Sequence, residues 1–187
     1  MAITLKKGSS FNLSKNEPGL KKLMIGLGWE FSSTTMLDLD ASAFMLKANG
    51  KIPDDAFFVF YNNLKSPDES LQHMGDNRTG KGDGDDELIL ANLTLVDPQV
   101  TEIAIVVTIH EAAVRRQNFG LLKDSYIRIF DVETEREILR YDLDAEFGKN
   151  TEVEFGRLQK IEGDWRFFAS GIGTNIGLEG LVNMFVE

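Results

Sequence analysis

The chain has 187 residues, 42% of them hydrophobic, and a formal net charge of −10 at pH 7. This length and composition predict one globular domain spanning residues 1–187 and exclude a disordered chain. The acidic excess disfavours nucleic-acid binding, and it disfavours docking on an anionic leaflet unless a cation bridges the two surfaces.

The sequence contains no cysteine and only two histidines. Disulfides, thiolate metal sites and cysteine nucleophiles are therefore excluded, and zinc is a poor fit. The N-terminus lacks the apolar core of a signal peptide, and no run of about 18 apolar residues occurs anywhere. We therefore expect a soluble, cytoplasmic protein that does not insert directly into a membrane.

Short strand-like runs separated by turn residues follow one another along the chain. The expected strands are Lys22–Glu30, Leu37–Leu46, Ala56–Tyr61, Leu88–Leu95, Glu102–Ile109, Tyr126–Val132, Glu137–Leu143, Glu152–Ile161 and Trp165–Ser170. Turn signals of the hairpin kind stand at Asn49-Gly50 and Gly163-Asp164. A spacing of about 8–12 residues with turn signals between the runs predicts an all-β fold, an antiparallel β-sandwich.

Two segments depart from the strand pattern and are expected to be short peripheral helices. The first is Glu111–Leu122. The second, Leu178–Val186, has its apolar residues at helical spacing, which suits a helix packed on the edge of the sandwich.

Within the run LDLDASAFML, Asp38 and Asp40 share one face because side chains alternate along a strand. Phe44 and Leu46 follow on the same face, so this face is acidic at one end and apolar at the other. Such a strand leaves the core and ends at a polar site at one pole of the sandwich. The pattern is also compatible with two aspartates that simply face water.

A second acidic stretch, GDNRTGKGDGDDE, covers residues 75–87 and combines five carboxylates with four glycines. The glycines allow backbone carbonyls to turn inward, and carboxylates with carbonyls are the ligands of a hard cation. Calcium fits better than magnesium because it accepts 6–8 oxygens in loose geometry. The spacing matches neither an EF-hand nor a repeated calcium-binding nonapeptide, so a solvated loop without a ligand stays open.

Enzymatic readings find less support in the residues. The sequence has no G-x-S-x-G motif, and GIGTNIG at residues 171–177 departs from the dinucleotide-binding fingerprint. Glycoside hydrolysis needs an acid in an apolar pocket, whereas the acids here are crowded together. A small-ligand enzyme or hydrolase that uses the acids for proton chemistry is the alternative to a cation site. A third reading is a scaffold that docks partner proteins and uses the ion only to order the loop.

Four stretches together resemble the tellurium-resistance TerD family of bacterial stress proteins: PGLKKLMIGLGWE (18–30), LDLDASAFML (37–46), FFVFYNNLKSPD (57–68) and GDNRTGKGDGDDE (75–87). The resemblance covers nearly the whole chain. It implies a calcium-binding β-sandwich of the cytoplasm without established enzymatic activity. Other proteins of the tellurium-resistance system are the candidate partners.

The resemblance also implies a set of metal ligands, carried over position by position. The candidates are Asp38, Asp40, Asp76, Asn77, Asp83, Asp85, Asp86 and Glu87, together with the backbone carbonyl of Gly82. Lys81 stands where loops of the family often carry an acid, which weakens the local negative charge. The expected function is binding of Ca²⁺ through the DLD strand and the glycine-rich loop, in a non-enzymatic stress-response protein.

Overall fold

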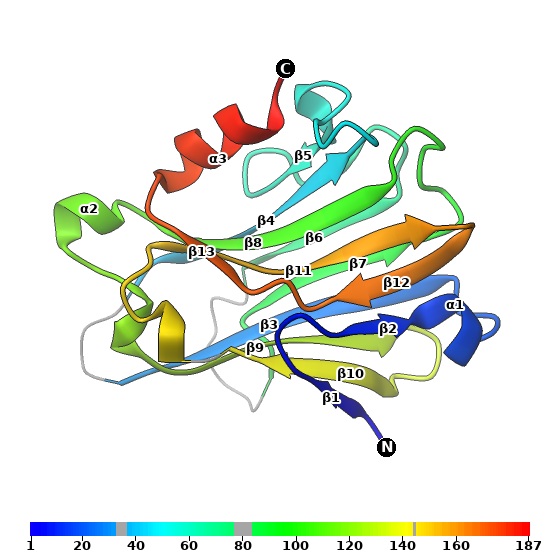
Figure 1. Cartoon of the computed structure of the whole chain (residues 1–187), viewed down its shortest axis with the longest axis horizontal. Coiled ribbons are helices and arrows are strands. Elements are labelled where there is room, and N and C mark those ends of the chain that lie inside the picture. The colour runs from blue at the N-terminus through cyan, green and yellow to red at the C-terminus, as the bar shows by residue number, and fades with distance from the viewer. Residues whose placement is uncertain (33–36, 77–83, 144) are drawn as a thin grey trace.

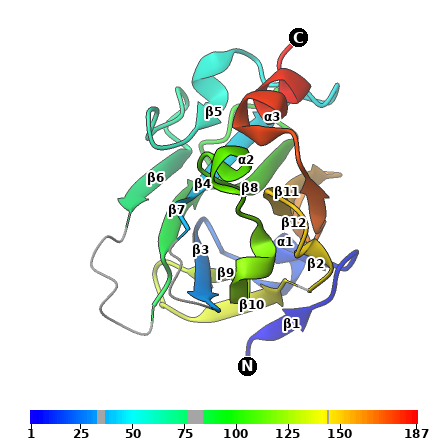
Figure 2. The same cartoon turned by 90° about the vertical axis from the view of Figure 1, so that its left-hand side faces the viewer.

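The computed structural model describes residues 1–32, 37–76, 84–143 and 145–187, with the backbone alone at positions 76 and 145. In these residues two sheets face each other, as Figures 1 and 2 show. The first sheet has six strands in the order β1 (Ile3–Leu5), β10 (Glu137–Asp142), β9 (Leu122–Asp131), β3 (Lys22–Phe31), β7 (Glu87–Asn92), β6 (Leu71–Asp76). Its pairs are antiparallel except for β1 with β10.

The second sheet has seven strands among the described residues. Their order is β2 (Ser10–Asn12), β12 (Asp164–Phe168), β11 (Glu152–Ile161), β8 (Glu102–Ile109), β4 (Leu39–Leu46), β5 (Phe58–Val59), and β13 (Ile172–Thr174) pairs with β11 beside β12. All its pairs are antiparallel. The expected all-β sandwich is confirmed.

Helical structure is short and peripheral. Within the described part of the chain it consists of α1 (Leu13–Asn16), η1 (Asp55–Phe57), α2 (Ala112–Arg115), η2 (Phe119–Leu121), η3 (Ala145–Phe147) and α3 (Gly177–Phe185), where η marks a 3-10 turn. The longest, α3, lies over the seven-stranded sheet (Figure 1). There Phe185 packs on Phe44 of β4, with ring centroids 4.5 Å apart. No helix of the described residues is long and apolar enough to span a membrane.

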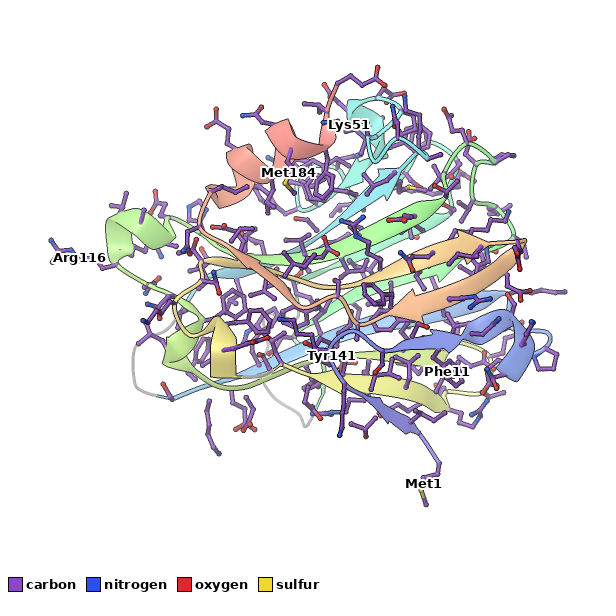
Figure 3. All side chains as sticks on the ribbon, in the orientation of Figure 1. Met1, Phe11, Lys51, Arg116, Tyr141 and Met184 are labelled. Atoms are coloured by element: carbon purple, nitrogen blue, oxygen red, sulfur yellow. The ribbon has the colours of Figure 1, made fainter. Side chains whose placement is uncertain are left out.

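The core lies between the sheets and follows the period-two alternation of the strands. On β3, Leu23, Ile25 and Leu27 are fully buried. Buried aliphatic and aromatic side chains from both sheets form one cluster with them. In Figure 3 Tyr141 lies inside the molecule, whereas Met1 and Arg116 project into solvent at its edges.

Three sequence-based element predictions need correction. The expected helix Glu111–Leu122 is the single turn α2 followed by η2, because Arg116 adopts a left-handed φ of 54° that ends α2. The expected strand Ala56–Tyr61 shrinks to β5, because the Asp54 side chain accepts a hydrogen bond from the Ala56 amide and starts η1.

The third correction concerns the hairpin between β11 and β12. Ile161 pairs with Asp164, so the two turn residues are Glu162 and Gly163 rather than Gly163 and Asp164. Both turn residues have positive φ, 53° and 84°. This is the turn geometry that matches the twist of antiparallel strands.

Candidate metal centre

The DLD segment and the end of the acidic loop meet at one end of the sandwich. The predicted strand Leu37–Leu46 starts two residues later, at Leu39, so Asp40 lies in β4 and Asp38 directly before it. Asp38, Asp40 and Glu87 line a cavity of about 440 Å³ together with His73 and Gly75, and Tyr61, Leu64 and His110 complete its wall. Three of the nine predicted ligands are therefore brought to one cavity.

Glu87 is the first residue of β7 and bridges the two sheets. Its side chain is 3% exposed, and its Oε2 accepts a hydrogen bond from the Ala41 amide of β4 at 2.9 Å. The other edge of β4 pairs with β8 throughout, and β5 reaches only Ala43 and Phe44. Glu87 therefore supplies the partner that the Ala41 amide would otherwise lack, and this contact fixes the carboxylate beside Asp40.

His73, on β6, is the second partner of Glu87. Its Nε2 lies 3.0 Å from Glu87 Oε2, and its Nδ1 accepts a hydrogen bond from the Gly75 amide at 3.1 Å. Burial lowers the pKa of His73, but the hydrogen bond and charge of Glu87 outweigh burial and raise it above its ordinary value. In the neutral ring, Nε2–H donates to Glu87 and Nδ1 accepts from Gly75.

Asp76 is placed only through its backbone, as the last residue of β6. It lies directly opposite Glu87 in the β6–β7 ladder. Asn77, Gly82 and Asp83 lie outside the described residues. Among residues 1–32, 37–76, 84–143 and 145–187, no group of three or more His, Cys, Asp or Glu side chains is arranged to hold a metal ion.

Asp85 and Asp86, the two candidates before Glu87, point elsewhere. Asp86 Oδ2 accepts a hydrogen bond from the Trp29 amide at 2.7 Å, just where the β3–β7 pairing ends at Leu27. Asp85 contacts Arg128 and Tyr126 of β9. Three consecutive acids thus reach three different surroundings, and only Glu87 reaches the cavity that Asp38 and Asp40 line.

The Asp85 contacts lie on the outer face of the six-stranded sheet. Because Ile127 and Ile129 point into the core, their neighbours Tyr126 and Arg128 point outward. Arg128 binds Asp85 through Nε at 2.8 and 3.0 Å and through one terminal nitrogen at 2.8 Å, and Tyr126 donates to Asp85 at 2.9 Å.

Sequence reasoning did not identify Tyr126 or Arg128 as neighbours of the acidic stretch. A signal for both is present in β3, where Gly26 and Gly28 interrupt a buried strand. Glycine inside a strand often marks the close approach of another group. A Cβ at position 26 would lie 2.2 Å from Asp85 Oδ2, and one at position 28 would lie 2.3 Å from the Tyr126 ring.

Comparison with known proteins agrees with the fold and with the motifs. The model of the TerD domain matches residues 1–185. The chain is 48% identical to the tellurium resistance protein TerD of an Alcaligenes species over 180 residues, covering 95% of this chain and 94% of that one. It is 42% identical to general stress protein 16U of Bacillus subtilis, covering 95% and 94%.

Among solved structures, the fold is similar to a homologue of the telluride resistance protein TerD from Streptomyces coelicolor. The TM-score is 0.68 at 21% sequence identity, covering 86% of this chain and 94% of the other. At this identity the likeness supports the fold alone.

Proposed function

The chain belongs to the TerD domain family, a family of tellurium-resistance and stress-response proteins, and on this premise we propose that it binds calcium and has no enzymatic activity of its own. The site we propose lies at the end of the sandwich where the DLD strand meets the start of β7. The cytoplasm is the compartment we propose for this role, with other proteins of the tellurium-resistance system as partners.

The observation that carries the proposal is the convergence of Asp38, Asp40 and Glu87 on one cavity from two different sheets. Carboxylate oxygens are the donors that calcium prefers. These three side chains are too few for a complete calcium shell of about 6–8 oxygens. Asp76 lies opposite Glu87 in the ladder, and we propose that it supplies a further oxygen together with the predicted ligands Asn77, Gly82 and Asp83, which lie outside the described residues.

The donor types also argue for calcium over other metals. The chain has no cysteine, so a thiolate site is excluded. Both ring nitrogens of His73 are engaged, Nε2 by Glu87 and Nδ1 by Gly75, so the imidazole offers no lone pair to zinc without losing a contact. A site built from oxygens of separate segments suits calcium, since magnesium demands near-ideal octahedral geometry.

One observation favours an enzyme as the second candidate. The His73–Glu87 pair beside a cavity resembles a base held by a carboxylate. However, the His73 side chain is 4% exposed, and both of its ring nitrogens are already hydrogen bonded. A general base must reach the proton it removes, so we favour cation binding.

Calorimetry with calcium and with magnesium tests the proposal. We expect calcium to bind in the micromolar range (Kd between about 10⁻⁷ and 10⁻⁵ M) and magnesium much more weakly. Equal affinity for the two ions, or no binding of calcium, would count against it.

A matched pair of variants locates the site. Asp40→Asn and Asp86→Asn each remove one negative charge and keep the shape of the side chain. Because the side-chain amide in Asp86→Asn retains an oxygen that can accept from the Trp29 amide, we expect little change there. Asp40→Asn should weaken calcium binding at least tenfold, about 1.4 kcal/mol. If Asp40→Asn binds calcium as tightly as the parent protein, Asp40 is not a ligand and the site lies elsewhere.

A further inference from the structure

We propose that the Asp85–Arg128 ion pair, which we call the latch, positions the calcium site from the outer face of the six-stranded sheet. In this proposal the positively charged Arg128 increases the affinity for calcium, although it carries the same sign of charge as the ion. Arg128 and Asp85 are positioning residues in this proposal, and neither contacts the ion. The inference rests on the proposed function and extends it to residues outside the cavity.

The first step is that Asp85 is already fully engaged. Its side chain is 3% exposed, whereas that of Arg128 is 29% exposed. Arg128 nitrogens and the Tyr126 hydroxyl donate to both carboxylate oxygens at 2.8–3.0 Å. An ionised carboxylate has about four lone-pair positions, and these contacts take most of them. Asp85 therefore has little capacity left for a metal ion.

The second step is that the sheet is shaped to receive Asp85. Gly26 lies directly opposite Arg128 in the β3–β9 ladder, and Gly28 lies opposite Tyr126. The space that a Cβ at position 26 would fill is occupied by the Asp85 carboxylate. Two glycines and two polar partners on adjacent strands thus form one recess for a single side chain.

The third step is that further contacts hold Arg128 and Tyr126 in place. Arg128 also binds Glu137 of β10 at 3.1 Å. The Arg140 guanidinium lies 3.8 Å from the centroid of the Tyr126 ring. Each of these two residues therefore has one contact that does not involve Asp85, and this contact holds it in place on the outer face of the sheet.

The fourth step connects the latch to the cavity. Asp85 lies two residues before Glu87, and between them the Asp86 amide donates to the Leu27 carbonyl at 2.7 Å. The latch and this bond fix the chain immediately before β7. They therefore limit the positions that the Glu87 carboxylate can take beside Asp40. Residues that orient metal ligands typically change metal affinity by about 10–100-fold when they are removed.

Whether Arg128→Gln weakens or tightens calcium binding shows whether Arg128 acts by positioning the site or only through its charge. Loss of a positive charge near a cation site should tighten binding if Coulomb energy alone mattered. We expect Arg128→Gln to bind calcium about tenfold more weakly. Lys123→Gln is the control, because Lys123 is on the same strand, its side chain is 67% exposed, and it pairs with Glu30 rather than with Asp85. The control should bind as the parent does, or slightly more tightly.

A double-mutant cycle decides whether Asp85 is a ligand. If Asp85 acts through Arg128, Asp85→Asn should weaken binding in the parent but change it little in Arg128→Gln. If Asp85 bound the ion itself, the two losses would add. Calorimetry gives the affinities, and circular dichroism checks that each variant is folded.

A measurement on the metal-free protein keeps the inference separate from the proposed function. Amide hydrogen exchange at Asp85–Glu87 should be faster in Arg128→Gln than in the parent, and unchanged in Lys123→Gln. Unchanged exchange, or calcium affinity equal to or tighter than that of the parent in folded Arg128→Gln, overturns the latch and leaves calcium binding standing. A parent protein that binds no calcium removes both proposals.

Discussion

Replacing Gly26 with alanine tests whether the recess for Asp85 contributes to stability. Alanine suits the backbone there, because Gly26 lies in a regular strand and not in the left-handed region. Its Cβ, however, would lie 2.2 Å from Asp85 Oδ2 and 2.4 Å from Asp85 Cγ. Since carbon contacts are comfortable at about 3.5–4.0 Å, the carboxylate must withdraw by about 1 Å or more.

The loss of stability in Gly26→Ala follows from the hydrogen bonds that break when the Asp85 carboxylate moves out of the recess. Hydrogen bonds to charged groups contribute about 1.5–3 kcal/mol each, and Arg128 stays partly solvated, so we take about 2–4 kcal/mol for the whole Asp85 cluster. Alanine lowers the entropy of the unfolded chain and returns about 0.4–1 kcal/mol. The net expectation for Gly26→Ala is a loss of about 1–3 kcal/mol in the free energy of unfolding.

Urea denaturation of the metal-free protein gives this free energy directly. Gly84→Ala is the matched control, because a Cβ at position 84 meets no atom of the described residues within 4 Å. We expect that control to remain within about 0.5 kcal/mol of the parent. In an Asp85→Ala background, Gly26→Ala should cost much less, since the clash is gone. A Gly26→Ala protein as stable as Gly84→Ala would refute the reasoning.

Three further predictions concern other groups. Burial raises the pKa of Asp68, but hydrogen bonds from Ser66, Ser70 and the Asp97 amide outweigh it and lower the pKa from 3.8. The stability that the ionised Asp68 adds is therefore complete above pH 3.8 and is lost as the pH falls through the lowered pKa. Asp68→Asn should therefore lose about 1–3 kcal/mol of stability at pH 6 and less at pH 3, measured by urea denaturation. Burial and the neighbouring Asp85 raise the pKa of Tyr126 from 10.0 to about 12. The stability that the protonated Tyr126 adds to the fold is therefore lost as the pH rises from about 10 to about 12. The phenolate absorbance that Tyr126→Phe removes should titrate near pH 12, and titration of that absorbance near pH 10 would contradict the assigned contacts. Calcium at about 100 times its dissociation constant should add about 2.7 kcal/mol and raise the melting temperature by about 5–10 °C, and an unchanged melting curve would remove the site.

The strands were predictable because their signal is local. Alternation and turn residues define Lys22–Phe31, Glu102–Ile109 and Glu152–Ile161 within two residues of their observed ends. Both faces of Glu102–Ile109 are buried, and apart from Thr108 its residues from Ile103 onward are all apolar. The predictions failed where a local side-chain hydrogen bond or a left-handed residue interrupted the expected element. The side chain of Asp54 started a 3-10 turn in place of a strand, and the left-handed Arg116 ended a helix after one turn.

The acidic residues show what the sequence determined by itself and what only the tertiary structure decided. The sequence placed Asp38 and Asp40 in one strand and Asp85, Asp86 and Glu87 at one loop end, and it pointed to oxygen ligands. Only the fold separated the last three. Their partners lie at Arg128, Trp29 and Ala41, which are 43, 57 and 46 residues away in the chain. Strand periodicity reports which face a residue takes, but not which strand lies opposite, so the contacts that distinguish a ligand from a latch appear only when the two sheets pack.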